Sequence, residues 1–167
     1  RDSVASRGLG DVYKRQLTNS FTEMYNLKNN LVNDKVSAKI SPAEYKKTYI
    51  DALSNYQNGE FEKAVTGFAG LVISDPGNDL ADNSQYWLAE CYYTMKNYKR
   101  AVIEFEKVFT FPGTDKDDDA QLKLGHCHRS MGNIDKAREE YQRLIDYFPG
   151  SEFFEKARVS LKQLNVQ

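Results

Sequence analysis

Apolar residues recur along this chain with the spacing of an α-helix rather than a β-strand. Leu88, Ala89 and Tyr92 lie at i, i+1 and i+4, and a segment beginning at Leu124 repeats the same spacing 36 residues later. Side chains three or four positions apart share one face of a helix, so each segment forms an apolar stripe that contains one small residue. The pattern predicts an all-α chain built from similar amphipathic helices.

The stripes belong to an internal repeat. Three Pro-Gly pairs stand at spacings of 36 and 37 residues, and upstream of each an alanine is followed four positions later by an aromatic residue. A small residue lets two helix backbones approach, and the aromatic ring then fills the groove against the next helix. The residues predicted to pack the repeats together are Ala64, Phe68, Ala101, Phe105, Ala137 and Tyr141.

Capping signals divide each repeat into two helices. Ser41 followed by Pro42 is a strong helix start, Asn97 and Asn133 are favourable N-caps, and each Pro-Gly pair ends a helix. Ser151 is expected to cap a last helix, which runs to Leu164 and covers the open end of the stack. The predicted helices of the three pairs span residues 42–57, 60–74, 80–95, 97–110, 117–131 and 133–147.

These positions resemble the tetratricopeptide repeat, with Leu-Gly/Ala-x-x-Tyr, then Gly-x-Tyr-x-x-Ala-x-x-x-Phe and a closing proline, across residues 45–149. The resemblance implies a right-handed superhelix of three helix pairs plus a C-terminal capping helix, and we assign residues 41–167 to this domain. The first helix departs from the pattern, because Asp51 and Asn55 stand where leucine and tyrosine are usual. There Tyr49, Leu53 and Tyr56 are expected to carry the apolar surface.

Within that superfamily one branch is similar in detail. The residues that carry the likeness are Tyr86-Trp87-Leu88-Ala89-Glu90-Cys91-Tyr92-Tyr93, Leu122-Lys123-Leu124-Gly125 and Tyr147-Phe148-Pro149-Gly150-Ser151, in units longer than 34 residues. They resemble the carboxy-terminal domain of the periplasmic accessory protein of the Tol-Pal system (the YbgF/CpoB family). The resemblance implies a periplasmic, non-enzymatic scaffold that coordinates peptidoglycan synthesis with outer-membrane constriction during cell division. Its implied partners are TolA-like and penicillin-binding-protein-like.

Two other functions stay open. One is a repeat lipoprotein of the outer-membrane protein assembly machinery, although the lipid-bearing cysteine of that protein has no counterpart in this sequence. The other is a cytoplasmic adaptor or co-chaperone that binds peptide tails. Adaptors of that kind usually carry several lysine, arginine and asparagine residues in the groove, whereas here the groove positions offer mainly aromatic side chains.

The inner groove of the stack is the predicted partner-binding site. Tyrosine suits such a surface because it presents a flat apolar face and one polar tip at small entropic cost. The alternative is that several of these tyrosines pack between units instead. The predicted groove residues are Tyr49, Leu53, Tyr56, Tyr86, Glu90, Tyr93, Leu122, His126 and Arg129.

The amino-terminal residues are treated separately. Residues 11–16 look like the translation of a transposon end used in sequencing libraries, so we interpret residues 1–16 as an artefact and expect them to be disordered. Residues 17–40 are predicted to form a helix and linker. Leu17, Phe21, Met24 and Leu31 stand at heptad-like intervals, and the resembling family has a trimerising coiled coil there, which suggests a homo-oligomer. The alternative is one helix folded back on the first repeat.

Composition and charge exclude several classes of function. Of 167 residues 40% are hydrophobic and 28% charged, and the formal net charge is −1. A nearly neutral chain has no surplus of lysine and arginine for nucleic acid or anionic lipid. No stretch approaches the roughly 18 apolar residues of a membrane span. We therefore expect one ordinary soluble domain that binds no nucleic acid.

Candidate chemical groups do not form a reactive site. Cys91 and Cys127 occupy equivalent positions of successive units, about 10 Å apart, which is too far for a disulfide, so free buried thiols are expected. The neighbouring His126, Cys127 and His128 point about 100° apart on a helix and cannot meet at one metal ion. The acidic run from Asp115 lacks the glycine and glutamate of a calcium loop. We expect no catalytic residues, metal or cofactor.

Overall fold

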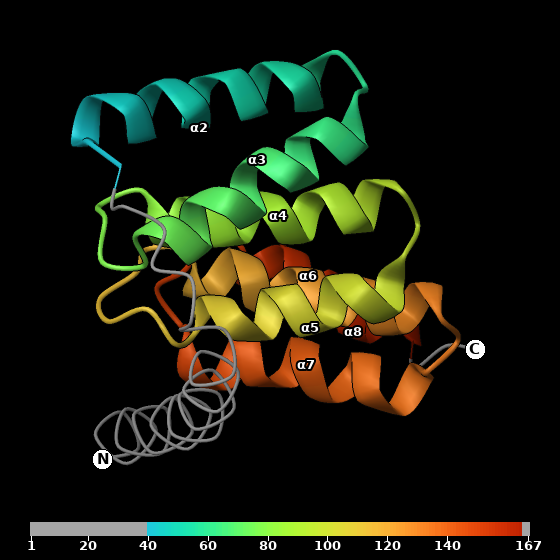
Figure 1. Cartoon of the computed structure of the whole chain (residues 1–167). Helices are drawn as coiled ribbons and strands as arrows, with labels where there is room; N and C mark the ends of the chain where they lie inside the picture. Colours follow the sequence, from blue (N-terminus) through green and yellow to red (C-terminus); the bar gives the residue numbers. More distant parts are fainter. Residues whose placement is uncertain (1–39, 165–167) are drawn as a thin grey trace, which may run out of the picture.

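The computed structural model describes residues 40–164, and all regular structure in that range is helical. The all-α prediction is therefore confirmed. The helices are α2 (Pro42–Gln57), α3 (Phe61–Ser74), α4 (Ala81–Thr94), α5 (Tyr98–Val108), α6 (Asp117–Ser130), α7 (Ile134–Tyr147) and α8 (Phe154–Leu164) (Figure 1). Residues 1–39 and the predictions that concern them lie outside the described range.

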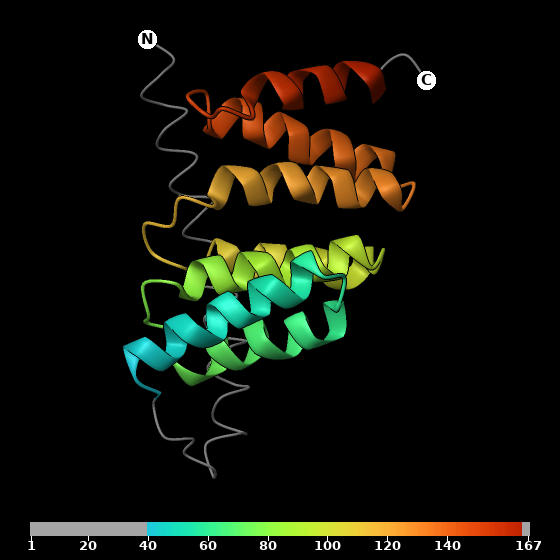
Figure 2. The ribbon, with the colours of Figure 1, turned by 90° about the horizontal axis from the view of Figure 1, so that it is seen from above.

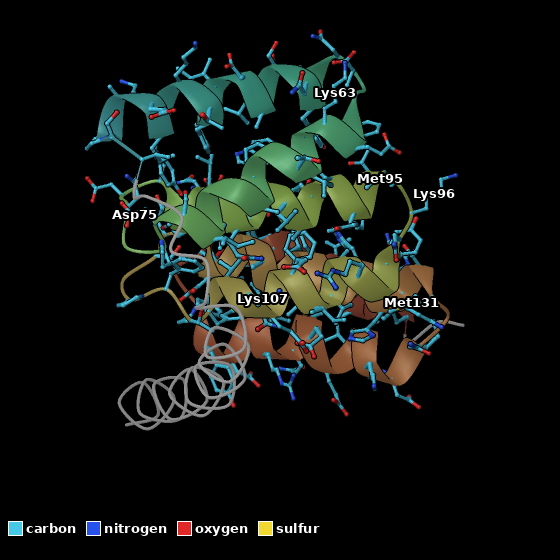
Figure 3. All side chains as sticks on the ribbon, in the orientation of Figure 1. Lys63, Asp75, Met95, Lys96, Lys107 and Met131 are labelled. Carbon is cyan, nitrogen blue, oxygen red and sulfur yellow. The ribbon has the colours of Figure 1, made fainter. Side chains whose placement is uncertain are left out.

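The helices form three antiparallel hairpins, which we call unit one (α2 and α3), unit two (α4 and α5) and unit three (α6 and α7). Helices that follow one another in the chain pack side by side, and α8 packs on α7. Figure 2 shows the hairpins as successive layers of one stack. The turns within hairpins, near Lys63, Lys96 and Met131, lie at one end, and the link after α3, at Asp75, lies at the other (Figure 3). The chain is a helical solenoid.

Local capping explains most of the helix boundaries. The Ser41 Oγ accepts a hydrogen bond from the Glu44 backbone N–H at 3.2 Å, and α2 spans the predicted residues. Asn97 caps α5 as predicted, accepting from the Arg100 backbone N–H at 3.3 Å. Asn133 stands at the N-cap of α7 as predicted, and its side chain makes no capping hydrogen bond.

The last helix begins later than predicted. The Ser151 Oγ accepts from the Phe153 backbone N–H at 2.9 Å, which closes a tight turn, and α8 starts only at Phe154. Serine side chains bind nearby backbone N–H groups in turns as readily as at N-caps, and here the turn forms.

The six predicted packing residues are all fully buried, with no exposed surface on any of them. Small residues let the two helices of a hairpin approach closely, at Ala52 and Gly67 in unit one and at Gly125 in unit three. A Cβ added at Gly67 would stand 2.8 Å from the Ala52 Cβ, and one added at Gly125 would stand 2.6 Å from the Tyr141 Cδ1. Unit one differs from the expectation, because its main buried residues on α2 are Tyr45 and Ala52. Its other apolar residues are only partly buried: Tyr49, Leu53 and Tyr56.

A pair of buried polar side chains links the two helices in units two and three. The Gln85 Nε2 donates to the Glu104 backbone oxygen and to its carboxylate, both at 2.9 Å. The Gln121 Nε2 makes the same two bonds to Glu140, at 3.1 Å and 2.6 Å. Each carboxylate also pairs with a cation one turn later, Lys107 in unit two and Arg143 in unit three. This Gln–Glu pair satisfies polar groups that would otherwise be costly to bury.

Both cysteines are unpaired and fully buried, as predicted. Burial raises the pKa of the Cys91 and Cys127 thiols to about 12, so they stay protonated at neutral pH and are poor nucleophiles. None of the helices in residues 40–164 is both long and apolar enough to cross a bilayer.

Candidate functional site on the first helices

The nine predicted groove residues lie on the first helix of each unit, in three rows that follow the 37- and 36-residue spacing of the repeat. Within each helix they stand at i, i+4 and i+7, which places them on one face. We call this surface the recognition face. Row one contains Tyr49, Tyr86 and Leu122; row two contains Leu53, Glu90 and His126; row three contains Tyr56, Tyr93 and Arg129.

Row one is the floor of the recognition face rather than its contact surface. Tyr86 is 6% exposed and Leu122 is 1% exposed. The Tyr86 ring packs edge-on against Phe105, with centroids 5.7 Å apart, and Tyr49 packs in the same manner against Phe68 at 5.8 Å. The Tyr49 and Tyr86 rings therefore contribute to the hydrophobic core more than to the contact surface.

Rows two and three are more accessible, except at Glu90, which is buried although the sequence predicts it on the contact surface. Leu53, Tyr56, Tyr93 and His126 are half-buried, and Arg129 is exposed. Tyr56 also joins two units, because its ring lies 5.1 Å from the Trp87 ring and its hydroxyl lies 3.0 Å from the Thr94 Oγ1. The accessible strip is narrower than the sequence predicts and follows the outer edge of the first helices.

An ion pair that the sequence did not predict crosses the recognition face between units two and three. The Lys123 Nζ of α6 lies 2.8 Å from each carboxylate oxygen of Glu90 on α4. The same ammonium group stands 5.0 Å from the centroid of the Tyr93 ring, within the range of a cation–π contact. Lys123 comes directly after the groove residue Leu122 but was not itself predicted to line the groove. Only the way in which units two and three stack brings its ammonium group to Glu90.

The environment of the pair shifts both pKa values. Burial raises the Glu90 pKa, and the neighbouring ammonium opposes this only in part. Burial alone would lower the Lys123 pKa, but the charge and hydrogen bond of Glu90 outweigh it and raise the pKa. A raised lysine pKa keeps the Lys123 ammonium charged at neutral pH. Its positive charge is balanced by the Glu90 carboxylate of the same chain.

The carboxy-terminal end of the recognition face contains a neutral histidine and an arginine. The His126 ring packs edge-on against Tyr141 at 5.7 Å. Burial, with the nearby cations Lys123, Lys156 and Arg129, lowers the His126 pKa to about 4. The Arg129 Nη1 donates to the Gln163 Oε1 of α8 at 3.3 Å, which ties the guanidinium to the terminal helix.

The recognition face offers contact surface rather than reactive groups. Among residues 40–164, no three histidine, cysteine or acidic side chains are arranged to hold a metal ion. The surface instead combines aromatic rings, an internally neutralised ion pair and an exposed guanidinium. Such residues serve molecular recognition, because rigid aromatic rings and arginine contribute most to protein interfaces.

The described residues form helical hairpins that stack in sequence, with their first helices side by side. This arrangement defines the helical-repeat class of solenoid proteins. Tetratricopeptide repeat family models match residues 82–111 and 119–151, which correspond to units two and three. The chain is a tetratricopeptide-repeat solenoid.

Solved structures of other proteins have the same fold. PcrH from Pseudomonas aeruginosa matches with a TM-score of 0.66 and 17% identity, over 77% of this chain and 96% of PcrH. The type III secretion chaperone SycD of Yersinia enterocolitica, solved with a peptide of the translocator YopD, has a TM-score of 0.65 and 19% identity, over 77% and 97% of the two chains. The second repeat domain of human RPAP3, solved with the HSP70 peptide SGPTIEEVD, has a TM-score of 0.61 and 16% identity, over 75% and 98%.

These likenesses establish the fold. No curated protein sequence matches the chain. The resemblance to the Tol-Pal accessory family depends on the sequence motifs alone.

Proposed function

We propose that this protein is a non-enzymatic protein-binding scaffold and that its recognition face binds a segment of a partner protein. The observation that carries the proposal is the accessible strip of Tyr56, Tyr93 and Arg129, at one equivalent position of three successive units. A repeated row of this kind suits an extended or helical segment lying across the units. Support comes from SycD and RPAP3, which have this fold and were solved with short peptides of other proteins.

We further propose that the scaffold acts in the bacterial cell envelope. Its role there is to coordinate peptidoglycan synthesis with outer-membrane constriction at division, as an accessory of the Tol-Pal system in the periplasm. The sequence motifs around Trp87, Gly125 and Pro149 support this role by resemblance. On the same grounds the proposed partners are TolA-like and penicillin-binding-protein-like, and the proposed homo-oligomer forms through residues 17–40, which lie outside the described residues.

A cytoplasmic peptide-binding adaptor is the second candidate. One observation favours it: the human RPAP3 domain has the same fold and was solved with a peptide that ends in acidic residues. The charge of the recognition face argues against it, because Lys123 is already paired with Glu90. The lipoprotein of the outer-membrane protein assembly machinery remains a variant of the envelope proposal.

The experiment that tests the proposal begins with the gene and its neighbours. We expect codons for a secretion signal upstream and Tol-Pal genes beside it. The purified full chain should bind the purified TolA-like protein encoded there, measured by isothermal titration calorimetry. The double variant Tyr93→Ala/Arg129→Ala should weaken this binding by about tenfold or more, because it removes an aromatic anchor and the exposed guanidinium.

A matched control separates binding from folding. The double variant Lys99→Ala/Ile103→Ala changes two exposed residues of α5, on the second helix of unit two, and should leave the affinity unchanged. Equal affinities for the wild type and the Tyr93/Arg129 variant would remove the recognition face from consideration. A gene without a secretion signal or Tol-Pal neighbours would reject the envelope role and favour the adaptor.

A further inference from the structure

Each junction between units is closed by a side chain that reaches back from the first helix of the later unit. At the first junction Trp87 contacts Tyr56 of unit one. At the second junction the equivalent position holds Lys123, which contacts Glu90 and Tyr93 of unit two. The equivalent of Glu90 in unit one is Leu53. At these positions the first junction is thus uncharged, whereas the second holds a cation and an anion.

A lysine on a peptide-binding face is a natural partner for a carboxylate, because ammonium–carboxylate hydrogen bonds are among the strong ones. Lys123 is not available for that role. Its Nζ is 2.8 Å from both oxygens of Glu90, and its side chain is 20% exposed. Asp119 on the same helix adds a second negative charge near the ammonium, and the neighbouring His126 is neutral at pH 7.

An acidic partner segment would therefore meet repulsion at the second junction. A carboxylate that approached Lys123 would come close to Glu90, whose side chain is only 10% exposed and is poorly screened by water. Displacing Glu90 instead would leave a buried carboxylate without its cation, which costs more than the new contact returns.

We propose that Glu90 is a specificity-determining residue, which holds Lys123 so that the second junction of the recognition face rejects acidic side chains of a partner segment and accepts uncharged ones. This inference rests on the proposed function, since it concerns the same face. It identifies the partner by chemistry: an uncharged, apolar or aromatic stretch rather than a tail of glutamates and aspartates.

The experiment uses Glu90→Gln, which keeps the shape of the side chain and removes its charge. The probe is the acidic peptide SGPTIEEVD with a fluorescent label, and its control is an amidated analogue in which glutamines and an asparagine replace the acidic residues. Binding to the full chain is measured by fluorescence anisotropy at low salt. We expect Glu90→Gln to bind the acidic peptide about tenfold more tightly than the wild type, as one released charge-assisted contact would give.

Two further variants make the result specific. The gain should vanish in Glu90→Gln/Lys123→Gln, because the Lys123 ammonium is the proposed hydrogen-bond donor to the peptide carboxylate. Glu90→Leu copies Leu53 of unit one and should show the same gain, which keeps the test decisive if one variant fails to fold. The wild type should bind the neutral analogue at least as well as the acidic peptide. A gain that persists without Lys123, or no gain in either single variant, would overturn the inference.

The outcome is distinguishable from failure of the proposed function. If Tyr93→Ala/Arg129→Ala abolishes binding of the TolA-like partner while Glu90→Gln gains nothing, the face binds proteins but Glu90 does not select among them. If the Tyr93/Arg129 variant keeps full affinity for that partner, the proposed function itself fails, whatever Glu90→Gln does.

Discussion

Lys96 has a backbone conformation that the equivalent positions of the other two hairpins give to glycine. Its φ is 60°, close to 79° at Gly59 and 76° at Gly132. The left-handed region costs a residue with a Cβ about 1–2 kcal/mol, whereas glycine enters it freely. The turn of unit two therefore carries strain that the turns of units one and three avoid.

Relieving this strain should stabilise the protein. Lys96→Gly is expected to raise the free energy of unfolding by about 1 kcal/mol, because the relief exceeds the entropy that glycine adds to the unfolded chain. Urea denaturation followed by circular dichroism measures the change. The control Lys99→Gly, an exposed position in α5, should lower the free energy of unfolding by a similar amount. Destabilisation by both variants would show that the Lys96 turn is not strained.

Because of His126, the free energy of unfolding depends on pH between the ordinary histidine pKa of 6.5 and the lowered value of about 4. Its pKa is lowered to about 4 from 6.5 in the unfolded chain, and burial lowers the His128 pKa too. As pH falls below 6.5, the unfolded chain binds protons that the folded chain does not, so stability present at neutral pH is lost. The raised Glu90 and Glu106 pKa values act in the opposite sense, because these carboxyls take up protons in the folded chain at a higher pH than in the unfolded chain.

We expect the free energy of unfolding to fall by about 2 kcal/mol between pH 7 and pH 5 through His126 alone. Thermal or urea unfolding at several pH values would record this slope. His126→Gln should flatten it, since glutamine does not titrate, and the control Lys46→Gln, at an exposed position of α2, should keep it nearly unchanged. A wild-type profile without slope between pH 6.5 and pH 5 would contradict the buried, neutral histidine.

At the scale of the helices, the buried Gln–Glu pair holds each hairpin of units two and three together. Gln121→Leu should lower the free energy of unfolding by about 2–4 kcal/mol, because it leaves the buried Glu140 carboxylate and backbone oxygen short of a donor. The double variant Gln121→Leu/Glu140→Leu should recover part of this loss, since neither partner is then left unsatisfied. Denaturant titrations of the three proteins give the comparison, and equal losses in both variants would argue against the pair.

Many of the helix boundaries could be predicted because capping residues and Pro-Gly pairs determine them locally. The start at Ser41 and Pro42 and the stops at the Pro-Gly pairs fix boundaries through backbone chemistry that neighbouring residues determine. The start of α8 was misplaced because a serine hydroxyl bonds backbone N–H groups in a turn as readily as at an N-cap. Helix packing at the repeated alanines followed from their periodicity.

Polar contacts between helices were harder to foresee. The sequence does contain a signal for the Gln–Glu pairs, because Gln85 and Glu104 recur as Gln121 and Glu140 at the repeat spacing. The Glu90–Lys123 pair had none, because unit two carries Trp87 where unit three carries the lysine. Its partners are 33 residues apart and meet only through the register of the stack.

At the scale of the whole molecule, we expect unit one to be the least stable part of the stack. The positions equivalent to the Gln–Glu pair hold Thr48 and Gly67, so this hairpin relies on close contact between Gly67 and Ala52. Within the described residues α2 packs mainly against α3, with little contact to α4. Terminal repeats with few partners open before the rest of a solenoid.

Amide hydrogen exchange should therefore be fastest at the amino-terminal end of the stack. Backbone amides of α2 are expected to exchange at least about tenfold faster than those of α6, which has packed neighbours on both sides. Mass spectrometry of the native full chain measures both helices in one experiment. Equal protection of α2 and α6 would mean that unit one is held by contacts beyond the described residues.

The matching Gln–Glu pairs of units two and three imply that each of these hairpins carries its own internal polar link. A duplicate of residues 117–152 inserted after unit three would keep that link, while the copy of Lys123 would face His126 at the new junction in place of Glu90. Such a solenoid could grow by gene duplication in steps of one hairpin, and every added step would lengthen the surface available to a partner by one more row.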